Sequence, residues 1–270
     1  MFKLVDLEKS VTAILSSDLG IREKASEIRL LVQEMLTDTS FLMSCIDQAI
    51  SNFEQYPNLR PHPPLFISME HQFAVHLIYW PAGHKNSPHM HSTWGTTGVF
   101  FNEIVIETFN TAGNSENPEL TIDNRFDAKR GEAGYLLPLC VHRVSNETNQ
   151  PSASLHLFGT DDKNEPAQSS TVWYGDNVGM PGDSKARAMG IFCEMLISIS
   201  GDQSKGLLIR VFALACNETK LRIVKGISER DIELSYQLSV ALEQELVGSD
   251  RARLSAINQN LAQKIKGSIH

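Results

Sequence analysis

The stretch YWPAGHKNSPHMHSTWG, residues 79–95, holds three of the nine histidines of the chain, and His89 and His91 are separated by a single residue. In a β-strand, residues i and i+2 point to the same face, so two imidazoles at this spacing can bind one metal ion. A helix would need a spacing of four residues instead. The pair predicts part of a metal site if this stretch is extended, and the alternative is a partly exposed loop pair.

The sequence pattern around this stretch is typical of β-strands. Short apolar or alternating runs are separated by Gly, Pro and Asn, namely QFAVHLIYW (72–80), GVFFNEIVIETF (98–109), AGYLLPLCVHRV (133–144) and SASLHLFG (152–159). No segment with a helical period and useful length lies between about residues 65 and 175. This pattern favours an antiparallel sandwich or barrel.

A metal site needs at least a third ligand. His142 ends a different β run, and strands far apart in sequence can converge on one ion inside a barrel. His156, in SLHLF, is a fourth candidate. Weaker candidates are His62, His71, His76 and His84. Three protein ligands leave coordination positions open, which is typical of a catalytic metal site. Imidazole suits Fe, Zn, Cu and Ni alike, so the ligands alone do not select the metal.

Helical patterns flank the β region. Residues 1–57 repeat apolar side chains at steps of three and four, and the prolines of YPNLRPHPP (56–64) end this pattern. Near the C-terminus, residues 228–247 and 249–266 predict a helical hairpin. Its first helix is expected to begin with Ser228 in a capping-box-like arrangement. We expect these terminal helices to pack on the fold or to join copies of the chain.

Composition excludes several functional classes. The net charge of −8 argues against a nucleic-acid groove and against an anionic membrane surface. No segment approaches the ~20 apolar residues that span a bilayer, and the first residues do not resemble a signal peptide. The four cysteines show no CxxC pairing, so we expect reduced thiols in a cytoplasmic protein.

Several motifs together resemble the cysteine dioxygenase family of cupins. They are the Trp–x–x–Gly–His lead-in at residues 80–84, the His-x-His pair, NEIVIETF, VHRVSN and SLHLFG, in the family's order. The resemblance implies a mainly β fold, with a cupin (double-stranded β-helix) barrel over residues 58–180. Helices over 1–57 would pack on the barrel, and a helical extension would occupy 183–270.

The resemblance also implies a reaction. Fe(II) would be held by His89, His91 and His142, with Zn or Ni as alternatives in purified protein. A small thiol would be oxidised by O₂ to a sulfinate. His156 and Ser154 would be catalytic, with His156 handling protons near its ordinary pKa of ~6.5. The expected substrate-binding residues are Arg60, Thr96, Phe158 and Trp80.

Three positions depart from the family pattern. Thr96 stands where many animal members carry a cysteine, and Phe158 stands where the family carries a catalytic tyrosine. The family's carboxylate-binding arginine aligns without gaps to Pro63, three residues from Arg60. Two alternatives therefore stay open: a cupin enzyme of the same lineage acting on a substrate that is not an amino-acid thiol, or a non-catalytic metal cupin whose helical tail recruits a partner protein.

Overall fold

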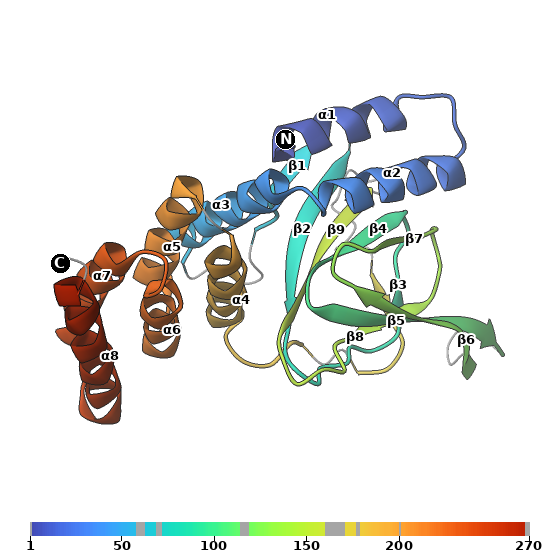
Figure 1. Ribbon diagram of the computed structural model, residues 1–270. Coiled ribbons are helices and arrows are strands. Elements are labelled where there is room, and N and C mark those ends of the chain that lie inside the picture. Colours follow the sequence, from blue (N-terminus) through green and yellow to red (C-terminus); the bar gives the residue numbers. More distant parts are fainter. Residues whose placement is uncertain are drawn as a thin grey trace. The chain divides into compact units, whose positions relative to one another are not determined.

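The computed structural model describes residues 2–57, 63–68, 72–113, 119–159, 171–176, 179–199 and 201–267 (Figure 1). The chain divides into two compact units, Met1–Arg187 and Ala188–His270. None of the helices in the described ranges is long and apolar enough to cross a membrane.

The first unit holds two five-stranded antiparallel sheets. The strands are β1 (Phe66–Ser68), β2 (Phe73–Trp80), β3 (His89–Met90), β4 (Gly95–Phe101), β5 (Glu103–Ala112), β6 (Glu119–Lys129), β7 (Ala133–Leu136), β8 (His142–Ser145), β9 (Ser152–Gly159) and β10 (Val172–Trp173). One sheet has the order β1-β2-β9-β4-β7 and the other β10-β3-β8-β5-β6. Sequence neighbours such as β8 and β9 thus lie in different sheets.

Side chains from both sheets share one hydrophobic core. Trp80 and Val99 come from the first sheet, and Ile104 and Val144 come from the second. Each is at most 4 % exposed. Two antiparallel sheets that bury their inner faces against each other form the predicted sandwich or barrel.

Three helices precede the sheets: α1 (Leu4–Leu15), α2 (Ile21–Met35) and α3 (Thr39–Gln55). Asp38 caps α3 by accepting hydrogen bonds from the backbone N–H groups of Ser40 and Phe41. The helix α2 packs on β4 and β7 (Figure 1). Its Val32 and Leu36 approach Gly98 of β4 so closely that a Cβ there would lie 2.8 Å and 2.4 Å from their side chains.

The second unit is helical. The helices are α4 (Ser184–Ser198), which starts within the first unit, α5 (Asp202–Leu214), α6 (Asn217–Ile227), α7 (Ile232–Glu243) and α8 (Gly248–Gly267). The expected start at Ser228 is wrong, because Ser228 follows the last residue of α6. Asp231 caps α7 instead, through its carboxylate and the N–H of Leu234 at 3.0 Å.

The expectation of a mainly β chain is also wrong. Within the described ranges, helices hold more residues than strands do. Local alternation predicts the β region, but most residues of the flanking segments are helical, and four of the eight described helices lie wholly in the second unit.

Candidate metal centre

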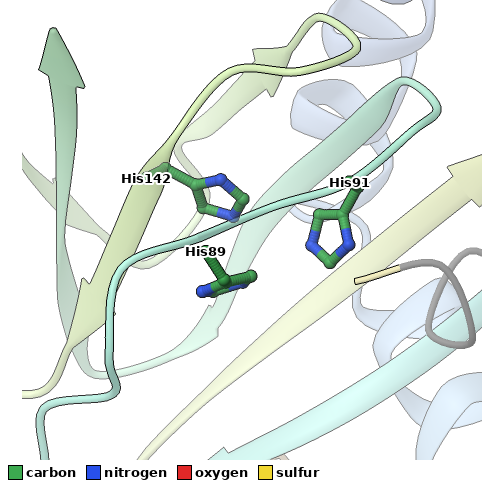
Figure 2. A group of neighbouring side chains, drawn as sticks. All are labelled: His89, His91 and His142. Atoms are coloured by element: carbon green, nitrogen blue, oxygen red, sulfur yellow. The ribbon is translucent and has the colours of Figure 1, made fainter. Parts of the chain in front are cut away.

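Three histidines converge between β3 and β8 (Figure 2). His89 lies directly opposite His142 in the antiparallel ladder of these strands, and His91 follows β3 on the same segment. One ring nitrogen from each of His89, His91 and His142 lies within 4.8 Å of the other two. His89 and His91 thus point to the same side of the chain, as residues two apart in an extended segment do.

The Nδ1 atom of each of these histidines lies within hydrogen-bond distance of an oxygen of the protein. The Nδ1 atom of His89 lies 3.0 Å from the Ser87 carbonyl, and that of His142 lies 3.0 Å from the Cys140 carbonyl. A carbonyl can only accept, so each Nδ1 carries a proton and each Nε2 presents a lone pair. The Nδ1 of His91 lies 3.1 Å from the Thr171 hydroxyl. Such partners orient imidazole ligands around metals.

Burial favours the uncharged form of His89 and His142. The side chains of all three histidines are at most 9 % exposed. Burial lowers the pKa of His89, although the Ser87 carbonyl opposes the shift. Burial also holds the pKa of His142 well below its ordinary value, and charge on His89 would lower it further. Neutral imidazole is the state that coordinates a metal, so the donor set fits a divalent transition-metal ion.

A row of side chains on one face of the first sheet includes a second group of polar residues. Ser154, His156 and Phe158 alternate along β9, and His156 lies opposite His76 of β2 and Thr97 of β4. The Ser154 hydroxyl lies 2.6 Å from His156 Nε2, and the Thr97 hydroxyl lies 3.0 Å from His156 Nδ1. His156 is thus fixed at both ring nitrogens.

Trp80 contacts Ser154 of this row from the neighbouring strand β2. Its indole N–H donates to the Ser154 hydroxyl at 2.7 Å, and its side chain is 2 % exposed. Since an indole N–H only donates, the Ser154 hydroxyl accepts from it and is free to donate its own O–H to His156 Nε2. Trp80 belongs to the hydrophobic core and positions Ser154, and its expected contact with substrate stays a prediction.

The low pKa of His156 argues against the proton handling near neutrality that the sequence predicts for it. Burial lowers the pKa of His156 to about 3, and charge on His76 would lower this pKa further. At neutral pH the ring is uncharged and does not titrate. Its structural role is to keep the Ser154 and Thr97 hydroxyls in place.

Thr96 faces the opposite side of β4 from Thr97, which lines the cavity. The Thr96 side chain is fully buried, but its hydroxyl has no hydrogen-bond partner in the described structure, whereas the Thr97 hydroxyl meets His156. Adjacent residues of a strand face opposite sides, so a shift of one residue changes the face. The sequence prediction of Thr96 as a substrate contact stays a prediction, and the strand alternation favours Thr97 for that position.

Phe158 lies beside the histidine cluster. Its ring centroid is 4.9 Å from that of His91 and 5.6 Å from that of His156. Phe158 supplies an apolar wall with no hydroxyl. The expected contact at Arg60 falls outside the described residues, as do His62 and His71.

A cavity of about 760 Å³ opens from the cluster inside the first unit. His142 and Thr97 line it, together with Thr108, which pairs with His142 across the strands. The Thr108 hydroxyl oxygen is buried and has no partner in the described structure. A buried hydroxyl without a partner beside a cavity is a position where a ligand atom can be bound.

Sequence reasoning missed Thr97, Thr108, Thr171 and Trp173. The alternation from Gly95 could have placed Thr97 inside, and the pairing of β5 with β8 places Thr108 beside His142. Trp173 of β10 pairs with His89, with ring centroids 4.4 Å apart. A two-residue strand has no periodicity, so no sequence signal predicted Trp173 or Thr171.

No protein-family model matches the chain, and no curated protein matches it. Among solved structures, a cupin superfamily protein from Desulfitobacterium hafniense is 14 % identical, with 33 % of this chain and 69 % of that chain covered and a TM-score of 0.27. Hydroquinone 1,2-dioxygenase, in complex with Cd²⁺ and 4-hydroxybenzonitrile, is 15 % identical, with 41 % and 71 % covered and a TM-score of 0.32.

Oxalate decarboxylase from Bacillus subtilis, described with Mn(II) centres, is 17 % identical, with 44 % of this chain covered and a TM-score of 0.28. The match spans only 26 % of that protein's chain. At these TM-scores the likeness carries no functional argument.

Proposed function

We propose that this chain is a cupin metalloenzyme that acts as an iron-dependent dioxygenase on a small molecule. The observation that carries the proposal is the set of three buried histidines with converging ring nitrogens, beside a cavity that His142 lines. Fe(II) bound by three imidazoles would keep open positions for O₂ and for a substrate atom.

The residues around the cluster have separate roles in this proposal. The carbonyls of Ser87 and Cys140 hold His89 and His142 in the tautomer that coordinates. Phe158 and Trp173 shield the cluster with aromatic surface. The Thr108 hydroxyl is available to orient a substrate oxygen or nitrogen next to His142. These groups would orient the metal ligands and the substrate and would exclude water. They supply no acid or base that titrates near neutrality.

The resemblance to thiol dioxygenases makes oxidation of a thiol to a sulfinate the first specific reaction to test. Two features favour the alternative of a non-thiol substrate. Phe158 lacks the phenol of the family, and a cavity of about 760 Å³ lies in the range that takes drug-sized ligands rather than an amino acid.

The test is metal analysis of protein purified without oxygen, followed by O₂ uptake with a panel of small thiols and of non-thiol acids and phenols. We expect iron to be bound and O₂ uptake to depend on a substrate in the panel. Bound metal with no substrate-dependent O₂ uptake would favour the non-catalytic cupin, and absence of any bound metal would refute the proposal.

A further inference from the structure

The cavity beside His142 has a buried inner part and an exposed mouth. Val99, Ile104 and Val144 line the inner part with His142 and are each at most 4 % exposed. At the mouth, Phe126 of β6 lines the cavity and is 54 % exposed. The cavity therefore runs from His142 to the surface.

Most of the inner lining is aliphatic. Val99, Ile104, Ile106, Ala128 and Val144 surround it, and the polar side chains at this depth are the hydroxyls of Thr97 and Thr108 and the ring of His142. Apolar cavities of this kind favour apolar ligand bodies, because water inside finds few hydrogen-bond partners. A ligand that fills the cavity must carry an apolar body.

The mouth carries two arginines from α2. Arg22 and Arg29 both line the cavity and are seven residues apart, so they share one face of the helix about 10 Å from each other. Within the described part of the chain, neither has a carboxylate within ion-pair distance. The one hydrogen bond recorded for them joins Arg29 Nη1 to Gln33 at 3.2 Å.

The acidic residues at the mouth already have donors. Asp127 accepts from Arg125 at 3.0 Å, and Asp123 accepts from Asn110 at 3.2 Å and from Asn124 at 2.6 Å. Glu132 accepts from the backbone N–H of Lys129 at 2.6 Å. The N–H groups of Arg22 and Arg29 therefore remain for hydrogen bonds to a ligand. A guanidinium can bind a carboxylate through two parallel hydrogen bonds.

We propose that the cavity takes an amphipathic carboxylate, with its apolar body among the aliphatic side chains, its carboxylate at Arg22 and Arg29, and its opposite end beside Thr108 and His142. As a substrate class this inference rests on the proposed function. As a binding site it stands separately, because none of its contacts needs a metal.

Calorimetric titration of the full chain with octanoate tests this inference, both with metal bound and after chelation. Octanoate should bind in both states, whereas 1-octanol should bind the wild type more weakly. The double variant Arg22→Gln/Arg29→Gln should weaken octanoate binding about tenfold or more, since each lost bond to a charged group has a measurable free-energy cost. Binding of 1-octanol should not change.

Lys24→Gln is the matched control, because Lys24 lies on the same helix, carries the same charge and donates to the Leu15 carbonyl outside the cavity. It should leave octanoate binding unchanged. Equal octanoate affinity in the double variant and the wild type would overturn the inference, as would octyl phosphate binding with no binding of octanoate. Octanoate binding to a protein that never takes up metal would support the inference while refuting the proposed function.

Discussion

Two buried histidines face each other across β2 and β9. His76 lies opposite His156, and its Nε2 has no hydrogen-bond partner in the described structure. Burial lowers the pKa of His76 to about 4 and the pKa of His156 to about 3. Both rings are therefore neutral in the folded chain, whereas an unfolded histidine takes up a proton near pH ~6.5.

These pKa values predict a loss of stability in mild acid. Below pH ~6.5 the unfolded chain binds more protons than the folded chain, so the free energy of unfolding falls as pH drops toward the folded-state values. Each histidine contributes a slope of up to about 1.4 kcal/mol per pH unit. Urea unfolding of metal-free protein between pH 7 and pH ~4.5 measures this slope, and His76→Gln should make it shallower. An equal slope in that variant would contradict the burial of a neutral His76.

Among single residues, the three candidate metal ligands could be predicted from the sequence, but the residues that surround them could not. His89 and His91 obey the two-residue period of a strand, and His142 ends a separate apolar run. Counting residues along the chain leads to Thr96, but such a count ignores the face of the strand, and the hydroxyl that meets His156 belongs to Thr97. The pKa of His156 depends on burial by distant segments, which no local pattern contains.

The contact between α2 and β4 depends on a glycine. A Cβ at Gly98 would overlap Leu36 and Val32, whereas a Cβ at Gly134 of β7 would meet nothing within 4 Å. The absent side chain lets the helix approach the sheet, and so brings the helix carrying Arg22 and Arg29 to the cavity mouth.

Gly98→Ala is therefore expected to lower the free energy of unfolding by about 1–3 kcal/mol, as overpacking does. Gly134→Ala serves as the control and should change it by less than about 1 kcal/mol. Chemical denaturation of the two variants measures both effects. Equal stability of the two variants would show that α2 does not pack on β4 as described.

Element boundaries depend on contacts that sequence patterns leave undecided. Ser228 and Asp231 both have the chemistry of an N-terminal cap, and the sequence favoured Ser228. The structure continues α6 to Ile227, so Ser228 becomes its C-terminal cap residue and Asp231 bonds the N–H of Leu234. The existence of the helical hairpin was predictable from periodicity, but its first residue was not.

In the whole molecule, the candidate site lies within one of the two compact units. His89, His91, His142 and the cavity all belong to Met1–Arg187. The helical unit contributes none of the described residues of this cluster. The expected role of its helices in joining copies of the chain remains a prediction.

Deleting residues 188–270 should thus leave metal binding intact, provided that circular dichroism shows a folded product. Metal analysis of the shortened chain checks this expectation, and loss of metal from a folded product would contradict it. Sedimentation of both proteins tests the assembly role, since a full-length chain that sediments as a monomer would refute joining by these helices.

The most direct test of the metal centre is the metal content of three proteins purified anaerobically from iron-supplemented cells: the wild type, His142→Ala and His76→Gln. The wild type should hold about one transition-metal ion per chain, and His142→Ala should lose most of it, because a three-histidine site has no ligand to spare. His76→Gln, outside the cluster, should retain it. Full metal occupancy in His142→Ala would contradict the account.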